Sequence, residues 1–133
     1  MVGRDGAVGD MGLIDAKIGR WAGRRVLVTG AAGLLGRSVT EQLIDRGAVV
    51  LGLDIAWPVH DMDRPTGLTV VPGDVRDRSA LEALILAERV DTVIHLAAQT
   101  LVGPAVDDPV STFSHNVAGT WALLEACRAR PSV

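Results

Sequence analysis

The chain has 133 residues, of which 48% are hydrophobic and 22% charged, and its formal net charge is −3 at pH 7. This length and composition fit one globular domain and exclude a disordered chain. The sequence has neither a basic run nor an apolar stretch of about 20 residues, so we expect no nucleic-acid partner, no membrane span and a cytoplasmic location.

Residues 1–23 are rich in glycine and weakly patterned, so we expect a mobile leader ahead of one domain over residues 24–133. From Arg25 on, short β-branched apolar runs alternate with segments of helical period. Strands are predicted over residues 25–30, 48–54, 68–75 and 90–98, and helices over residues 34–47, 77–89 and from 108 onward. This order predicts an α/β fold with a parallel sheet, because parallel strands need helical crossovers.

Apolar spacing predicts the face that each helix buries. In the last helix the spacing predicts a packed stripe. The three predicted inner faces are Leu35, Val39 and Leu43; Leu81, Leu84 and Ile85; and Val110, Phe113, Val117, Trp121 and Leu124. Asp108 followed by proline predicts the start of the last helix. Ser79 and Glu82 have capping-box spacing, and Asp77 is a second candidate cap for the same helix.

The stretch VLVTGAAGLLG places Gly30 directly after the first strand, with Gly33 and Gly36 at the start of the next helix. A helix N-terminus offers free N–H groups and the positive end of the helix dipole, and glycine lets a ligand approach the backbone. A pyrophosphate fits that position. Three glycines alone are as often a tight turn, so the interpretation depends on residues elsewhere in the chain.

Two carboxylates provide that support. Asp54 ends the second strand, where it could accept both hydroxyls of an adenosine ribose and repel the 2′-phosphate of NADP. Asp74 follows the third strand and could accept the adenine amino group, with Val75 against the ring. The alternatives are a solvated aspartate for Asp54 and a helix cap for Asp74.

The fourth strand ends in HLAAQT, where small Ala97 and Ala98 leave room for a flat ring. We interpret His95 as a core histidine with satisfied hydrogen bonds, or as one that supports site residues without touching a ligand, rather than as a catalytic one. Asn116 and Gly119 interrupt the last helix although both are poor helix formers. A side chain turned toward the sheet edge and a close helix contact would explain them.

Five blocks of this sequence resemble, in order, those of the NAD-dependent epimerase/dehydratase family. They are VLVTGAAGLLG, Asp54, GDVRD, VIHLAAQT and DPVSTFSHNVAGTWALLEACR. These are extended short-chain dehydrogenases/reductases that act on nucleotide sugars. The resemblance runs from about Trp21 to Arg130, and the family's T-G-x-x-G-x-x-G motif has the glycine spacing found here. It implies a Rossmann-like parallel sheet with helices on both faces, ending after the fourth strand and its helix.

The resemblance also implies roles for individual residues, with NAD as the cofactor and NADP less favoured. Gly30, Gly33, Leu34, Leu35 and Gly36 would line the pyrophosphate, Asp54 would hold the ribose, and Asp74 with Val75 would bind adenine. Leu96, Ala97 and Ala98 would lie along the nicotinamide, and Asn116 would contact the cofactor or anchor the strand ends. Gln99 and Thr100 would begin the substrate-facing loop.

Catalysis in the family uses a Tyr-x-x-x-Lys pair, in which the tyrosinate takes the hydroxyl proton. This sequence has no tyrosine, and Lys17 is its only lysine, so we expect no catalytic residue and no metal site within it. A nucleotide sugar would be a substrate only if the missing half were supplied.

Three interpretations stay open. The chain could be the NAD-binding N-terminal portion of a nucleotide-sugar epimerase or dehydratase. It could be a non-catalytic NAD-binding module, or a half-site completed by another polypeptide. It could also be a remnant that binds nothing tightly. The fourth strand should have an unpaired outer edge, which predicts a homo-oligomer or a complementing chain at that edge.

Overall fold

The computed structural model describes residues 19–58, 64–131 and 133. The elements are β1 (Arg25–Thr29), α2 (Leu34–Asp45), β2 (Val49–Asp54), β3 (Thr69–Pro72), α3 (Arg78–Ala87), β4 (Thr92–His95), α4 (Val102–Asp107), α5 (Pro109–Phe113), the π-helical turn η1 (Ser114–Ala118) and α6 (Gly119–Arg128). The predicted alternation of strands and helices is confirmed. The helix predicted from residue 108 consists of α5, η1 and α6, while α4 had no counterpart in the prediction.

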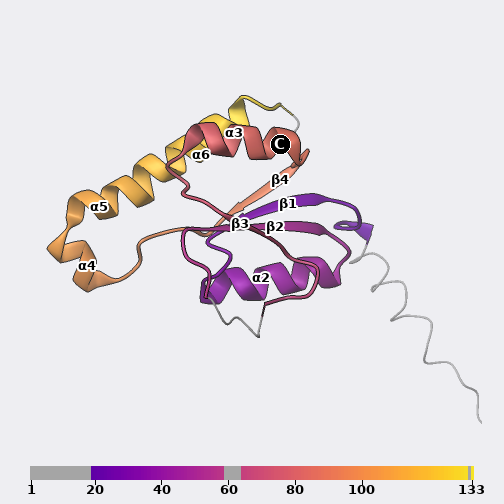
Figure 1. The fold of residues 1–133 in the computed structure, drawn as a ribbon, viewed down its shortest axis with the longest axis horizontal. Coiled ribbons are helices and arrows are strands. Elements are labelled where there is room, and N and C mark those ends of the chain that lie inside the picture. Colours follow the sequence, from indigo (N-terminus) through magenta and orange to yellow (C-terminus); the bar gives the residue numbers. More distant parts are fainter. Residues whose placement is uncertain (1–18, 59–63, 132) are drawn as a thin grey trace, which may run out of the picture.

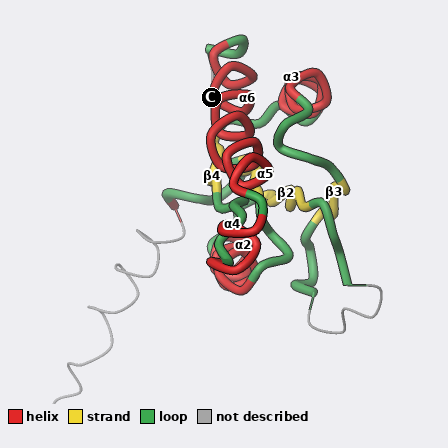
Figure 2. The backbone as a smooth tube through the Cα atoms, turned by 90° about the vertical axis from the view of Figure 1, so that its left-hand side faces the viewer, coloured by secondary structure: helices red, strands yellow, loops and turns green. Residues whose placement is uncertain are grey.

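The four strands form one parallel sheet in the order β3-β2-β1-β4. Helix α2 covers one face of the sheet, and α3 and α6 lie side by side over the other (Figure 1). Figure 2 shows the same three layers, with α2 on the opposite side of the strands from α3. The predicted α/β, Rossmann-like arrangement with helices on both faces is therefore confirmed.

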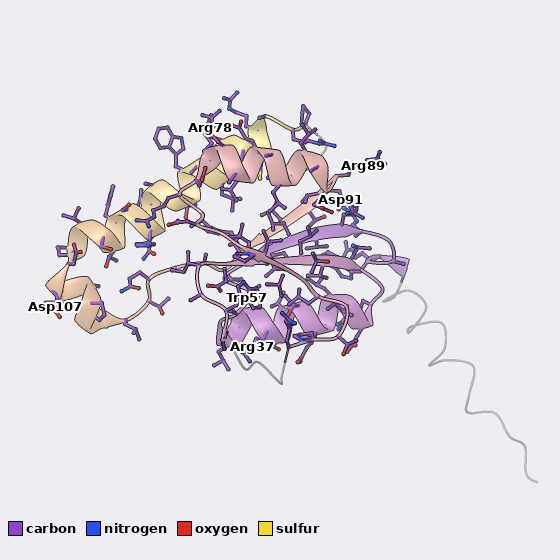
Figure 3. The ribbon with its side chains drawn as sticks, viewed as in Figure 1. Arg37, Trp57, Arg78, Arg89, Asp91 and Asp107 are labelled. Carbon is purple, nitrogen blue, oxygen red and sulfur yellow. The ribbon has the colours of Figure 1, made fainter. Side chains whose placement is uncertain are left out.

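Each face of the sheet has its own hydrophobic cluster. Leu27, Leu51, Leu81, Ile85 and Leu123 belong to the cluster under α3 and α6. Its counterpart on the α2 side contains Val26, Val28, Val50 and Leu43, with Trp57 packed between the strands and α2 (Figure 3). Alternate residues of β1 and β2 enter the two clusters, which is why the middle of each strand is continuously apolar.

The fourth strand was predicted as buried, and this is wrong. All four residues of β4 are half-buried, because β4 pairs only with β1 and lies at the edge of the sheet. Among the described residues no strand pairs with its outer side. The expectation of an unpaired outer edge is confirmed for this part of the chain.

The predicted stripe on the last helix is also wrong. Phe113, Val117, Trp121 and Leu124 are exposed, and Trp121 keeps 68% of its surface accessible. The buried face of α6 consists of Gly119, Leu123 and Ala126, which pack toward α3 and the sheet. The spacing therefore identified a real apolar face, but not the one that packs within this chain.

Helix caps follow the sequence more closely. The Asp108 carboxylate accepts the Ser111 N–H at 2.9 Å, and Pro109 begins α5, as predicted. For α3 the cap is Asp77, whose carboxylate accepts the Ala80 N–H at 3.0 Å. Ser79 lies inside the helix, so its assignment as the cap is wrong.

The leader predicted over residues 1–23 lies mostly outside the described residues. Trp21 packs against the α2-side cluster, and the Gly23 N–H donates to the Gly47 carbonyl at 2.9 Å. In the described part of the chain no helix is long and apolar enough to cross a membrane.

Candidate functional site

A cavity of about 580 Å³ lies at the carboxyl ends of β1, β2, β3 and β4. Its lining includes thirteen of the residues predicted from sequence, namely Gly30, Gly33, Leu34, Leu35, Gly36, Asp54, Asp74, Val75, Leu96, Ala97, Ala98, Gln99 and Thr100. The sequence separates these residues by up to 70 positions. The parallel topology brings them together, because every strand ends at the same edge of the sheet.

Each of the three glycines has a different structural role. Gly30 has a φ of +70°, and a Cβ there would lie 2.7 Å from the Ala97 backbone nitrogen. At Gly36 a Cβ would lie 2.1 Å from the Gly30 carbonyl oxygen, so this glycine lets α2 pack on the turn. Gly33 is less crowded, with its nearest atom 3.3 Å away, and it is the N-cap residue of α2.

The N-terminus of α2 opens into the cavity. Gly33 provides no side-chain cap, and the first turn of α2 contains no acidic residue. The first N–H groups of a helix have no acceptor within it, and the dipole adds a partial positive charge there. Leu35, predicted to face the core, is instead 62% exposed and lines the cavity together with Leu34. This end of the cavity suits an anionic group.

Asp54 joins the glycine turn to the end of β2. Its carboxylate accepts the Ala32 N–H at 3.0 Å and the Ala56 N–H at 3.3 Å. Each oxygen keeps a second lone pair, since a carboxylate can accept about four hydrogen bonds. The side chain can therefore order the turn and still accept hydroxyl groups from a ligand.

The Asp74 carboxylate already accepts several hydrogen bonds from Arg76, which its position in the sequence does not predict. The Arg76 guanidinium bonds both carboxylate oxygens, with Nη2 2.6 Å from Oδ2, and the Arg76 N–H donates to Oδ1 at 2.9 Å. The hydrogen bonds from Arg76 lower the pKa of Asp74 below its ordinary value. Helix capping, the alternative for Asp74, is not its role, because Asp77 caps α3.

Asn116 does not line the cavity but fixes one of its walls. Its Nδ2 donates to the Gln99 carbonyl at 2.9 Å, and its Oδ1 accepts the Gln99 N–H at 2.7 Å. This matches the expectation of a side chain turned toward the sheet edge. Gly119 likewise allows a close contact, because a Cβ there would lie 2.8 Å from Val75 Cγ2.

Sequence reasoning missed several lining residues. They are Ala32, Leu53, Ile55, Ala56, Pro58, Gly73 and His115. Five of them, Ala32, Leu53, Ile55, Gly73 and His115, adjoin a predicted residue in the sequence, a signal that could have found them. His115 stands beside Asn116 in η1, and its Nδ1 lies 2.8 Å from the Ser111 carbonyl. Among the described residues no cluster of metal-ligating side chains occurs.

Several known proteins are similar to this chain in sequence or in fold. A UDP-glucose 4-epimerase of Halalkalibacterium halodurans is 37% identical over 100 residues, which is 75% of this chain and 30% of that protein. The structure of an epimerase from Methanothermobacter thermautotrophicus matches with a TM-score of 0.78 and 32% identity, over 88% of this chain and 35% of that one. The Thermus thermophilus UDP-glucose 4-epimerase, solved in complex with NAD, matches with a TM-score of 0.72 and 40% identity, over 79% of this chain and 34% of that one.

The chain thus spans about a third of the length of the relatives it matches. A family model covers residues 26–133, which include β1 from its second residue, the other three strands and the whole cavity. The chain belongs to the NAD dependent epimerase/dehydratase family.

Proposed function

We propose that this chain binds NAD and forms the cofactor-binding N-terminal portion of a nucleotide-sugar epimerase or dehydratase. The observation that carries the proposal is the cavity at the strand ends, which joins an uncapped helix N-terminus, the Asp54 carboxylate and the small residues Ala97 and Ala98. Three of the similar solved structures hold NAD.

The cavity fits such a dinucleotide part by part. The first turn of α2 can bind the pyrophosphate through backbone N–H groups, because Gly33 leaves the approach open. Asp54 can accept ribose hydroxyls and disfavours a 2′-phosphate by charge repulsion. At the end of β4, Ala97 and Ala98 offer a flat apolar wall for the nicotinamide ring.

The chemistry of the whole enzyme is a further part of the proposal. When bound, NAD would supply a reversible hydride acceptor for the sugar carbon that carries the reacting hydroxyl group. The residues described here bind and orient the cofactor, while the base that takes the hydroxyl proton would come from outside this chain. The sequence contains no tyrosine to fill that role.

Calorimetric titration with NAD tests the binding proposal. We expect saturable heat for the wild-type chain and at least a tenfold loss of affinity in Gly33→Val and in Asp54→Ala, of the order that losing charge-assisted or multiple hydrogen bonds produces. Asp45→Ala, at an exposed position of α2, is the matched control and should bind like wild type. The proposal fails if millimolar NAD releases no heat.

The preference for NAD over NADP rests on Asp54 alone and needs its own test. Asp54→Asn keeps the oxygen that accepts the Ala32 N–H but removes the negative charge. We expect this variant to narrow the difference between NAD and NADP affinity by roughly tenfold. A wild-type chain that binds NADP more tightly than NAD would overturn the assignment.

A second candidate function is a half-site completed by another polypeptide or by a second copy of this chain. The observation that favours it is the outer edge of β4, which no strand covers among the described residues and which keeps unpaired backbone groups. Sedimentation of the chain alone, and mixed with the remaining part of a related epimerase, tests the idea. A monomer in both samples would contradict it.

A further inference from the structure

His95 is hydrogen bonded at both ring nitrogens. Its Nδ1 lies 2.6 Å from Thr29 Oγ1 on β1, and its Nε2 lies 2.9 Å from Thr120 Oγ1 on α6. The residue ends β4, directly before the segment 96–99 that forms one wall of the cavity. The predicted satisfied hydrogen bonds of His95 are confirmed, although the residue is half-buried rather than part of the core.

The hydrogen bonds that the two threonine hydroxyls donate and accept indicate which nitrogen of the imidazole carries a proton. Thr29 Oγ1 accepts the Ala97 N–H at 3.3 Å and shares the Leu96 N–H, which lies 3.2 Å from it and 3.1 Å from the Thr29 carbonyl oxygen, so both of its lone pairs face donors. Its one hydrogen is then donated to His95 Nδ1, which must be unprotonated. Thr120 donates its hydrogen to the Asn116 carbonyl at 2.6 Å and therefore accepts from His95 Nε2–H. The network requires a neutral ring with its proton on Nε2.

The same network holds the cavity wall at two points. Thr29 binds the backbone of Leu96 and Ala97, while Asn116 binds both backbone groups of Gln99. His95 joins these two anchors through Thr120. A proton on Nδ1 would face the Thr29 oxygen, whose lone pairs are already occupied. The imidazole would then compete for this oxygen with the Leu96 and Ala97 N–H groups, of which Leu96 has the Thr29 carbonyl as a second acceptor at 3.1 Å.

Among the described residues, no other ionisable group forms a hydrogen bond to the His95 ring. Asp91, Cys127 and the C-terminal residue Val133 line a second cavity of about 420 Å³ with His95. Asp91 accepts the Arg25 N–H at 2.9 Å and pairs with Arg24. Burial raises the pKa of the Cys127 thiol, which stays neutral. Within residues 19–58, 64–131 and 133, the side chains bonded to the ring are the hydroxyls of Thr29 and Thr120, which do not titrate.

We propose that His95 is a positioning residue whose neutral, Nε2-protonated ring holds segment 96–99 in place for the dinucleotide, so that protonation of the ring loosens this wall. The inference extends the proposed NAD site by giving it a dependence on pH. Burial lowers the pKa of His95, in keeping with a ring that the fold keeps neutral. Loss of the wall is then expected only below the ordinary histidine range of about pH 6.5.

The first test needs no ligand. Nitrogen-15 NMR of the imidazoles in the full chain should show His95 with a proton on Nε2 and none on Nδ1 at pH 7.5. Hydrogen exchange at the Ala97 amide, normalised by that of the Leu27 amide in β1, should accelerate severalfold as His95 becomes protonated. An Nδ1-protonated neutral ring, or Ala97 protection that does not change with the titration, would overturn the proposal.

The second test measures NAD affinity against pH in wild type and in His95→Asn. Asparagine can still accept from Thr29, yet it does not titrate. We expect the wild-type Kd to rise roughly fivefold more than that of the variant between pH 7.5 and pH 5.5, the loss of about one hydrogen bond. Thr120→Val and Thr120→Ser separate the Nε2 contact from packing, and only Thr120→Ser should keep the wild-type pH profile.

The two proposals fail in different ways. If the chain binds no NAD, the proposed function falls while the NMR test of His95 still stands. If NAD binds and the wild-type and His95→Asn profiles run parallel, His95 does not position the wall, and the inference is wrong. Should His95→Asn prove unfolded by its melting curve, the ring tautomer and the Ala97 exchange of the wild-type chain decide the question.

Discussion

The two sides of the cavity differ in how the chain builds them. The β1–α2–β2 side contains the glycine turn, and its strands are buried on both faces. The opposite side, from β4 through α6, has a half-buried strand, short helices, a π-helical turn and an exposed apolar face. Backbone contacts that only glycine permits fix the first side, whereas side-chain hydrogen bonds between distant residues fix the second.

The consequence concerns the kind of residue that each side can tolerate. On the glycine side almost any added atom collides with backbone, because Gly30 and Gly36 have backbone atoms within 2.9 Å of a built Cβ. On the other side the polar side chains of His95, Thr120 and Asn116 carry the structure and can be changed singly. Substitutions should therefore destabilise the first side strongly and the second in smaller steps.

The largest effect is expected at Gly36. Gly36→Ala places a Cβ 2.1 Å from the Gly30 carbonyl oxygen, so α2 or the turn must move. We expect a loss of about 2–4 kcal/mol in the free energy of unfolding, the range of overpacking at a backbone contact. Gly103→Ala is the control, since nothing lies within 4 Å of its Cβ. Denaturant unfolding of both variants gives the comparison, and equal stabilities would contradict it.

Neighbouring leucines of α6 test which face of the last helix packs. Leu123 is 3% exposed and Leu124 is 62% exposed. We expect Leu123→Ala to cost about 2–4 kcal/mol, because it leaves a cavity in the core. Leu124→Ala should change the free energy of unfolding by less than about 0.5 kcal/mol in dilute solution. The reverse order in chemical denaturation would show that the helix is rotated.

The cap of α3 gives a smaller effect. Removing the Asp77 carboxylate leaves the Ala80 N–H without its acceptor, so Asp77→Ala should lose about 1 kcal/mol. Ser79→Ala should be near neutral, because Ser79 lies inside the helix. Thermal melts of the two variants distinguish them. A larger loss in Ser79→Ala would restore the capping box predicted from sequence.

The smallest effect concerns acid stability at the Asp74–Arg76 pair. The hydrogen bonds from Arg76 lower the pKa of Asp74 in the folded chain, so the pair stabilises the fold above the unfolded pKa of about 3.9 and the gain is lost as pH falls through the folded pKa. The side chains are partly exposed, which limits the gain to under about 1 kcal/mol. Arg76→Gln should raise the pKa of Asp74, as measured by carbon-13 NMR of the carboxyl. An unchanged value would contradict the pairing.

Much of the fold is readable from sequence because local signals agree with it. The glycine turn, Asp54 and the Asp108-Pro109 start each depend on a few adjacent residues. The apolar face with Trp121 was misjudged because periodicity reveals that a helix has an apolar face but not what covers it. Arg78 of α3 pairs with Glu125 of α6 at 3.7 Å, a contact that no spacing rule predicts.

The sequence predicted which residues line the site better than it predicted the hydrogen bonds between them. Its lining follows from the rule that ligands bind at the carboxyl ends of parallel strands. Three sets of hydrogen bonds depend on the direction of a side chain. They join Arg76 to Asp74, Asn116 to Gln99, and His95 to two threonines. These directions are set by tertiary packing, which residue spacing does not contain.

The most direct test of the account is an NMR titration of the nitrogen-15-labelled chain with NAD. We expect the amide shifts to cluster at the cavity, on Gly33, Leu34, Asp54 and Ala97, and to leave Cys127 beside the second cavity unchanged. Shifts centred on Thr92, Leu124 and Cys127, or no shift at millimolar NAD, would contradict the assignment of the strand-end cavity as the dinucleotide site.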